Sequence, residues 1–247
     1  MPMELGYWNI RGLAGGIRML LEYCGADWID TQYEVVQAAS SSDMTIKVGD
    51  RATAWDASQW FNAKNSPEFQ ENFDFPNLPW LKDGDVHISQ SNTVFQYIAR
   101  KYKIGQDLSD TEAWRIDLAK DQLGDFRLGF LMMLYDMPSH PWAERETYCK
   151  NTLIPNLEQI DRFIGANTYV AGATLTWVDF MFWETFDQMH RFDDSLFSGL
   201  ENIMRFKTHF ESLPKVKAFF DSDKFMVGPI VNKMALWGGD RELKKSW

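Results

Sequence analysis

Two positions in the sequence carry residues that could hold an anion. Tyr7 ends a short apolar run and precedes the turn Asn9-Ile10-Arg11-Gly12, so its phenol could donate a hydrogen bond to an anion at the end of a strand. Gln90 and Ser91 open a helix-forming segment, and the unpaired N–H groups and positive dipole end of a helix favour a carboxylate. Both positions also have an ordinary interpretation: an amphipathic tyrosine at a strand end, and a serine that only caps a helix.

The composition argues against several other kinds of site. Only two cysteines occur, Cys24 and Cys149, with no CxxC motif or Cys/His cluster, so neither a disulfide framework nor a metal site is predicted. The 35 acidic and 25 basic residues give a formal net charge of -10, which disfavours nucleic acid as a partner. Because no run of about 18 apolar residues and no signal-peptide pattern is visible, we expect a cytoplasmic protein that does not enter a membrane.

The first hundred residues are expected to alternate strands and helices. A β-α-β unit comes first, formed by a strand, a helix and a parallel strand at residues 4–8, 14–24 and 29–36. Gly25 provides the helix C-cap, and Asp83-Gly84 predicts a hairpin turn, followed by a helix over 91–102. This order is typical of a thioredoxin-like domain, placed at residues 1–102, with a long inserted loop at about 37–54.

The rest of the chain has helical periodicity almost throughout. After a polar linker at 103–109, we expect an all-helical domain at 110–247, with helices at 110–136, 142–164, 177–190, 200–212 and 214–221. Pro155 should kink the second of these helices and Gly165 should end it, while Thr176-Trp177-Val178-Asp179 opens the third as a capping box. The predicted fold class is therefore a two-domain α+β fold.

Several motifs resemble those of one known family. Gly6-Tyr7-Trp8-Asn9-Ile10-Arg11-Gly12-Leu13 resembles the opening of mu-class cytosolic glutathione transferases, whose pattern is G-Y-W-D-I-R-G-L. Five further segments resemble family motifs in the family's order: Asp74-Phe75-Pro76-Asn77-Leu78-Pro79, Gln90-Ser91-Asn92, Tyr97-Ile98-Ala99-Arg100-Lys101, Val178-Asp179-Phe180 and Lys233-Met234-Ala235-Leu236-Trp237-Gly238. Any one match is weak, but six in order over both predicted domains are specific.

The resemblance implies an enzyme that conjugates the thiolate of glutathione to electrophilic small molecules, a detoxification reaction. Glutathione is then a co-substrate, hydrophobic electrophiles are the second substrates, and no separate cofactor is expected. Tyr7 is implied to stabilise the thiolate, and Tyr135 is implied to assist the electrophile as a general acid. The residues implied to bind glutathione are Tyr7, Trp8, Trp60, Lys64, Asn77, Leu78, Pro79, Gln90, Ser91 and Asp125. Those implied to line the electrophile pocket are Trp8, Ile10, Leu13, Arg127, Leu128, Leu131, Tyr135 and Asn232.

The resemblance also implies a homodimer. Phe75 resembles the aromatic key that inserts into the partner subunit, and Asp125 is implied to reach the partner's γ-glutamyl ammonium. The Leu78–Pro79 bond is implied to be cis, which turns the Leu78 backbone toward the cysteinyl unit of glutathione. Ordinary roles stay open at this point. Phe75 could be a core residue and Asp125 an exposed acid on a helix. Tyr135 could serve only in packing, and Lys64 could be a solvated surface charge.

Two departures from the family pattern bear on binding. Ala57 stands where the family commonly has arginine, and the loop before it is longer than the family's. Lys47 or Arg51 in that loop could replace the missing cation, or the loop could be a solvated insertion. The main alternative function is a non-catalytic ligand-binding or structural protein on the same fold. A thiol–disulfide exchange enzyme would need a cysteine in place of Tyr7.

Overall fold

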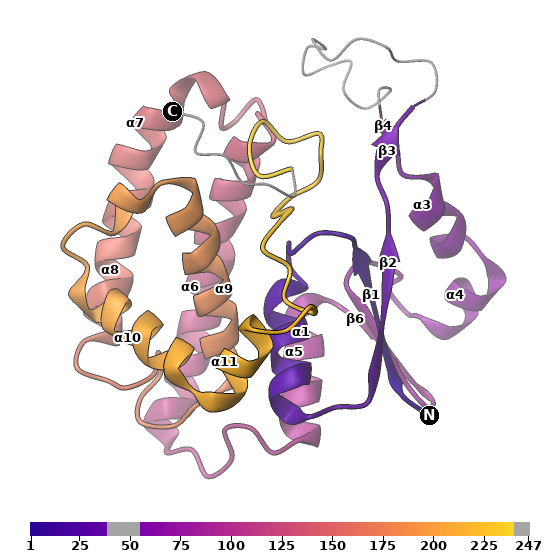
Figure 1. Cartoon of the computed structure of the whole chain (residues 1–247), viewed down its shortest axis with the longest axis horizontal. Coiled ribbons are helices and arrows are strands. Elements are labelled where there is room, and N and C mark those ends of the chain that lie inside the picture. The colour runs from indigo at the N-terminus through magenta and orange to yellow at the C-terminus, as the bar shows by residue number, and fades with distance from the viewer. Residues whose placement is uncertain (39–54, 240–247) are drawn as a thin grey trace.

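A four-stranded sheet forms the N-terminal half of the computed structural model, which describes residues 1–38 and 55–239. Its strand order is β2-β1-β5-β6 (Figure 1), and the strands are β1 (Met3–Trp8), β2 (Trp28–Tyr33), β5 (Trp80–Asp83) and β6 (Val86–Ser89). β1 pairs in parallel with β2 and antiparallel with β5. The predicted β-α-β unit and the hairpin are both confirmed, and Gly84 takes the positive φ of 60° in the hairpin turn.

Two helices cover the face of the sheet that looks toward the second half of the molecule, α1 (Gly15–Cys24) and α5 (Ser91–Lys101) (Figure 1). α1 ends as predicted at Gly25, whose φ of 65° lets its N–H reach back to the carbonyl of Glu22. The apolar side chains of α1, from Ile17 to Leu21, are buried, and α1 packs on a helix of the second half. The end of β1 therefore lies at the junction of the two halves.

The segment around the predicted insertion contains structure that the sequence did not indicate. The expected strand 29–36 is divided: β2 ends at Tyr33, and a separate strand β3 (Val36–Gln37) pairs antiparallel with β4 (Trp55–Asp56). Helices α3 (Ser58–Lys64) and α4 (Pro67–Asn72) follow. Residues 39–54, with Lys47 and Arg51, lie outside the described residues, so the proposed roles of that loop stay predictions.

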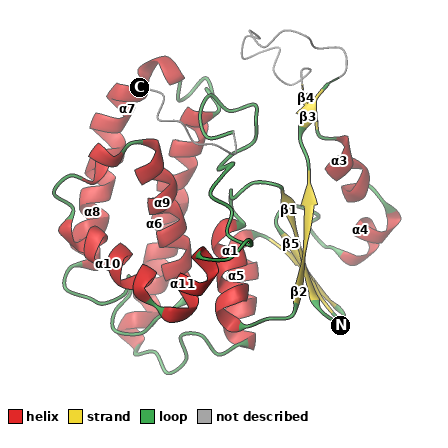
Figure 2. Cartoon of the chain, in the orientation of Figure 1, coloured by secondary structure: helices red, strands yellow, loops and turns green. Residues whose placement is uncertain are grey.

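The second half is built of helices (Figure 2), in agreement with the prediction. They are α6 (Asp110–Leu134), α7 (Arg145–Tyr148), α8 (Ile154–Ile164), α9 (Trp177–Phe192), α10 (Glu201–Ser212) and α11 (Pro214–Phe220), with short 3-10 helices η1 (Trp142–Glu144) and η3 (Asp194–Phe197). The predicted single helix 142–164 is subdivided, because a π-helical segment η2 (Cys149–Leu153) lies just before Pro155, which has no N–H to donate. Gly165 ends α8 as expected.

The chain after α11 returns to the sheet and runs between the two halves, where Figure 1 draws it in yellow. The N–H of Arg11 donates to the carbonyl of Pro229 (2.8 Å), and the N–H of Gly12 donates to that of Ile230 (2.9 Å). Farther along, the N–H of Leu236 donates to the carbonyl of Leu134 at the end of α6 (2.8 Å). This segment therefore connects the turn after β1 to the end of the longest helix.

The start of α9 is held by the predicted capping motif. The Asp179 carboxylate is fully buried and accepts hydrogen bonds from the N–H groups of Val170 (2.8 Å) and Thr176 (2.7 Å) and from the Thr176 hydroxyl (3.0 Å). These bonds satisfy donors at the helix start and in the preceding loop. α9 is the helix against which the sheet half docks, so its start helps to place the junction.

None of the helices that the structure describes could span a lipid bilayer, since each is too short or too polar.

We predict that Asp179→Ala will lower the free energy of unfolding by about 3 kcal/mol, because three buried donors lose their acceptor. Ser109→Ala is the matched control, since Ser109 caps α6 in the same kind of motif but at an exposed position, and it should cost about 1 kcal/mol. The measurement is urea unfolding followed by circular dichroism. Equal losses in the two variants would contradict the role given to burial.

Candidate active site

Tyr7 lies at the end of β1 with its ring under the turn that follows. The ring is 6% exposed, and the phenol oxygen accepts a hydrogen bond from the N–H of Leu13 (3.0 Å). Gly12 has a φ of 42°, and a Cβ there would lie 2.7 Å from that oxygen, so only glycine lets the turn close over Tyr7. Burial raises the pKa of Tyr7, although the Leu13 N–H and the charge of Arg127 act against this. The hydroxyl therefore keeps its proton at neutral pH and can donate it.

Tyr135 has the same arrangement at the C-cap of α6. Its oxygen accepts a hydrogen bond from the N–H of Asn232 (3.0 Å), in the segment that returns after α11. Burial raises the pKa of Tyr135 to about 12, although the hydrogen bond from the Asn232 N–H acts against this. Tyr7 and Tyr135 are thus two protonated phenols, each with its oxygen fixed by a backbone donor.

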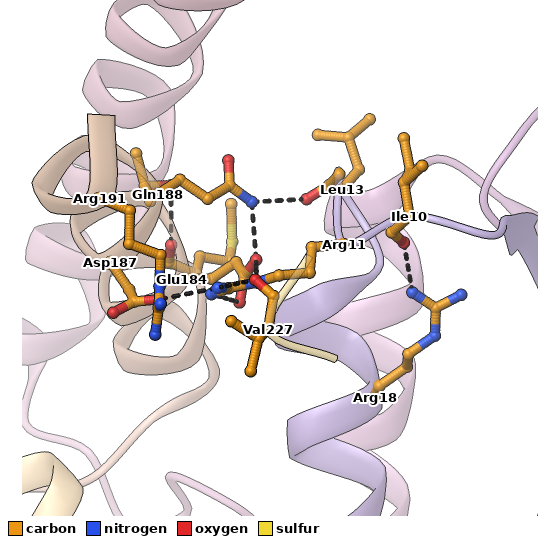
Figure 3. Close-up of polar contacts among 12 residues, drawn as sticks. Ile10, Arg11, Leu13, Arg18, Glu184, Asp187, Gln188, Arg191 and Val227 are labelled. Atoms are coloured by element: carbon orange, nitrogen blue, oxygen red, sulfur yellow. Dashed lines mark hydrogen bonds and ion pairs between the residues drawn. The ribbon is translucent and has the colours of Figure 1, made fainter. Parts of the chain in front are cut away.

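The turn between Trp8 and Leu13 is held by a buried ion-pair network (Figure 3). Nε and Nη2 of Arg11 each donate to one oxygen of Glu184, both at 2.9 Å, and Nη1 donates to Asp187 (2.7 Å). Burial disfavours charge on Arg11, but Glu184 and Asp187 together raise its pKa. Burial likewise disfavours the Asp187 carboxylate, yet Arg11 and Arg191 lower its pKa to about 2. Arg11 and Asp187 are therefore charged at neutral pH.

Two further side chains bind the turn through the carbonyl of Gly12. Nε2 of Gln188 donates to this carbonyl (3.2 Å) and to Glu184 (2.6 Å), and the guanidinium of Arg127 on α6 also donates to it. Arg127 is 9% exposed. The structure thus shows a contact with the turn that the sequence did not indicate, and the expected contact of Arg127 with an electrophile stays a prediction.

The acidic and amide partners of the turn are functional candidates that the sequence analysis missed. Glu184, Asp187 and Gln188 follow one another at helical spacing on α9, and all three are buried in a helix that is otherwise mostly apolar. Three polar residues on one buried face are a readable signal, because burial without partners would cost several kcal/mol. Their partner Arg11 belongs to a motif that was recognised, but its own role was not assigned.

The segment before β5 has the geometry that the resemblance implied. The Leu78–Pro79 peptide is cis, as expected, and a second cis bond at Gly228–Pro229 was not anticipated. Leu78 is buried, while its N–H donates to Oδ1 of the exposed Asn77 (2.9 Å). Asn77 therefore occupies the backbone donor that would otherwise be available to a peptide-like ligand in this structure.

Gln90 has the least favourable backbone of the site residues. Its φ of 71° and ψ of 114° are rare for a residue with a side chain and cost about 1–3 kcal/mol. The ordinary interpretation of Ser91 as an N-cap is not supported: Gln90 occupies the cap, and Ser91 is the first residue of α5. The N–H groups of this first turn have no partner within the helix, so the helix start retains its affinity for a carboxylate.

On α3, Trp60 is 3% exposed and packs edge-on between the rings of Tyr33 (5.2 Å between centroids) and Phe69 (5.6 Å). It is thus a core residue as well as a candidate ligand. Lys64, one turn later, is half-buried, and Ala57 is the N-cap of the helix. The roles of Trp60 and Lys64 toward glutathione stay predictions.

The residues expected in the electrophile pocket are brought together only in part. Ile10 and Asn232 line a cavity of about 450 Å³, and Asn232 also joins this cavity to Tyr135 through its N–H. Trp8, Leu13 and Leu131 are half-buried and pack against the hydrophobic core, but they do not line this cavity. By contrast, Leu128 is 54% exposed and borders a separate groove of about 340 Å³, which is lined also by Asp125.

The ordinary role considered for Phe75, that of a core residue, is wrong, because its side chain is 74% exposed. Asp125 is likewise exposed on the outer side of α6, and the groove that it lines contains none of the Tyr7 turn. Within one chain, the structure therefore does not bring Asp125 to Tyr7.

Neither the cysteines nor the potential metal ligands form a second reactive or metal-binding site within residues 1–38 and 55–239. No group of three or more histidine, cysteine, aspartate or glutamate side chains could hold a metal ion there. Burial raises the pKa of both Cys24 and Cys149 to about 11, so their thiols are protonated at neutral pH and poorly suited to thiol–disulfide exchange.

Comparisons with known proteins fit this geometry. The family model described as glutathione S-transferase, C-terminal domain, matches residues 124–223. Glutathione S-transferase Mu 5 of Mus musculus is 39% identical over 236 residues, which cover 96% of this chain and 96% of that protein. The Mu 5 protein of Rattus norvegicus is 37% identical and the Mu 3 protein of Homo sapiens 36%, each over 96% of this chain and 95% of the relative.

Solved structures share the fold. The glutathione S-transferase Blo t 8 superposes with a TM-score of 0.77 at 24% identity and covers 95% of this chain and 99% of its own. A pi-class glutathione S-transferase of Onchocerca volvulus gives a TM-score of 0.71 at 22% identity, over 95% of this chain and 100% of its own. The predicted α+β fold is thereby confirmed.

We predict that Glu184→Gln will lower the free energy of unfolding by about 3–5 kcal/mol, because Arg11 then loses a buried ion-pair partner. The control is Asp221→Asn, which removes the exposed Lys217–Asp221 pair and should cost less than about 0.5 kcal/mol. Urea unfolding of both variants provides the test. If the free energy of unfolding fell as little in Glu184→Gln as in the control, the network would not be what holds the junction.

Proposed function

Because this chain belongs to the mu class of glutathione S-transferases, we propose that it ionises the thiol of glutathione and conjugates it to electrophilic small molecules. The observation that carries this proposal is the environment of Tyr7. Its oxygen already accepts the Leu13 N–H, so its own proton is available to a ligand, and its pKa is raised so that this proton stays bound.

The nucleophile in this reaction is the thiolate. A free thiol of this type has a pKa near ~8.5, so most of it is protonated at neutral pH. A hydrogen bond from Tyr7 to the charged sulfur would contribute roughly 1.5–3 kcal/mol, which lowers the thiol pKa by about one to two units. The sulfur then attacks the electrophile as an anion. Glutathione is a co-substrate in this scheme, and we propose no separate cofactor.

The N-terminal half offers suitable groups for the remaining parts of glutathione. The first turn of α5, after Gln90, suits the γ-glutamyl carboxylate. The cis Leu78–Pro79 segment suits backbone pairing with the cysteinyl unit, once the Asn77 side chain releases the Leu78 N–H. Lys64 supplies a cation for the glycyl end. These assignments follow the family's order and are offered as proposals.

Tyr135 suits the role of an acid toward the electrophile. Its pKa of about 12 keeps the phenol protonated, and the Asn232 N–H fixes its oxygen beside the cavity that Ile10 lines. A proton donated to oxygen as charge develops typically accelerates such steps about 10²- to 10⁴-fold. A non-catalytic ligand-binding protein on this fold would need neither phenol in this state.

We predict that Tyr7→Phe will reduce turnover about 10- to 1,000-fold and raise the apparent pKa of bound glutathione, with little change in glutathione affinity, because the lost bond is to the thiolate alone. The measurements are the pH dependence of kcat/KM and the ultraviolet absorbance of the bound thiolate. An unchanged pH profile would reject the assignment, and the absence of a thiolate band with the unaltered protein would favour the non-catalytic alternative.

We further propose a cytoplasmic homodimer. Phe75 protrudes beside the hairpin, and the outer side of α6 carries the exposed side chains of Trp114 and Leu118, each more than half exposed. A second copy that covered these groups would remove a large apolar area from water. The exposed Asp125 lies on the same helix, so it could reach the partner's glutathione.

The dimer proposal gives a prediction for two variants with different effects. Asp125→Ala should raise the glutathione KM severalfold without changing the oligomeric state, because it removes only a charge contact to the ligand's ammonium. Phe75→Ala should weaken the dimer, whereas Phe61→Ala, a control at another exposed phenylalanine, should not. Sedimentation at several concentrations gives the oligomeric state. A fully active monomer at high dilution would sink the proposal.

A further inference from the structure

Strand β2 forms an open edge of the four-stranded sheet. In the order β2-β1-β5-β6 it has a neighbour on one side only, and it pairs with β1 in continuous register, without a bulge. The segment Trp28–Tyr33 contains no proline or lysine, which are residues that commonly protect an exposed edge from pairing. This edge is therefore able to accept another strand.

The hydrogen bonds to β1 show which backbone groups of β2 face outward. The carbonyls of Asp27 and Tyr33 accept hydrogen bonds from N–H groups at the start of β1 and just after its end, both at 2.9 Å. The odd-numbered residues thus direct their backbone groups at β1, and in a parallel pair the alternate residues, Asp30 and Gln32, direct theirs to the other side. In the described part of the chain, no group bonds to the N–H or the carbonyl of Asp30 or Gln32.

A cavity of about 490 Å³ lies beside this edge, between β2 and the segment that follows α11, drawn in yellow in Figure 1. The even-numbered side chains of β2 point toward α1, where Asp30 binds Arg18 and Trp28 binds Glu22. The walls include Trp28, Asp30 and Gln32 on β2, and Phe225, Val227 and Pro229 on the returning segment. The opposite face of the strand carries Ile29, which is 52% exposed. An added strand could therefore place alternate side chains in the cavity and on Ile29.

The charges around the edge favour a basic partner. Both cations that line the cavity, Arg18 and Lys224, already bind carboxylates. By contrast, Asp27 and Glu34 flank the strand and Asp223 lines the cavity, and these three carboxylates form no ion pair with any described residue. Lysine or arginine side chains that approached the edge would thus meet carboxylates that are not yet neutralised.

We propose that the β2 edge binds an extended, basic segment of another protein, which adds a fifth strand to the sheet. Its backbone bonds to the outward N–H and carbonyl groups of Asp30 and Gln32, and its cationic side chains, at alternate positions, enter the cavity. A second copy of this chain is a poorer occupant, because antiparallel pairing of two such edges would bring acidic residues of the two copies together. The cavity contains none of the residues assigned to glutathione or the electrophile, so this inference goes beyond the proposed function.

The probe is an eight-residue peptide of alternating lysine and valine with both ends blocked, titrated into the full-length protein by calorimetry. We expect a Kd of about 100 µM that rises with added salt. Gln32→Pro should raise this Kd at least about tenfold, because proline removes the outward N–H and leaves the bonds to β1 in place. The matched control is Gln32→Ala, which removes only a side chain that donates to Asp30 and should change the Kd less than about twofold.

Two measurements on the unaltered protein keep the test valid if Gln32→Pro does not fold. Peptides N-methylated on all lysine amides or on all valine amides should differ, since only alternate amides face β2: one should lose binding and the other should keep it. In addition, the unmodified peptide should slow amide hydrogen exchange at Asp30 and Gln32. Exchange at Ile29 and Thr31, whose N–H groups already bond to β1, should change little.

The outcomes are distinct from those that test the glutathione chemistry. Binding that needs the Gln32 N–H, slows exchange at the two outward amides and exceeds that of a glutamate–valine peptide supports the inference. Equal binding by folded Gln32→Pro, equal loss with both methylated peptides, or equal binding of the glutamate–valine peptide overturns it. Self-association of the unaltered protein that Gln32→Pro abolishes would overturn it as well, because the edge would then belong to a second copy.

Discussion

The forked ion pair between Arg11 and Glu184 is the contact on which the rest of the site depends. Both side chains are almost completely buried, so contacts within the protein must replace the hydration that each charge loses on folding. Three hydrogen bonds from Arg11 to Glu184 and Asp187 provide that compensation, and they fix the turn after β1 on the side of α9. The turn covers Tyr7, so the position of the phenol follows from an interaction made behind it.

The site is assembled from three parts of the chain that meet at the junction of the two halves. β1 brings Tyr7, α6 ends at Tyr135, and the segment after α11 supplies the Asn232 N–H and the carbonyls that hold the turn. In both phenols a backbone N–H donates to the oxygen, which leaves the phenolic proton for a ligand. The donor to Tyr7 lies only six residues along the same segment, whereas the donor to Tyr135 comes from the distant segment after α11, so the second contact forms only when that segment has returned.

The electrostatics of the junction differ from those of the protein as a whole. The chain carries a formal net charge of -10, which keeps polyanions away from most of its surface. Behind the turn, however, cations and carboxylates are paired inside the molecule: Arg11 binds Glu184 and Asp187, Arg191 and Lys207 also bind Asp187, and Lys207 binds Glu211.

The sequence alone determined the features that depend on neighbouring residues. Gly25 ends α1, Asp83 and Gly84 turn the hairpin, and Asp179 caps α9, because caps and turns are set by the backbone preferences of a few adjacent residues. Family motifs added Tyr7 and the cis bond at Pro79, which no periodicity could supply.

Only the tertiary structure decided which side chains share an environment. Arg11 and Glu184 are separated by 173 positions, and nothing local to either residue names the other as its partner. The same holds for Trp60, which is a core residue among aromatic rings, and for Arg127, which faces the Gly12 carbonyl. Local preferences act over a few residues of chain, whereas burial and charge pairing depend on distances in space that are fixed only when the two halves pack together.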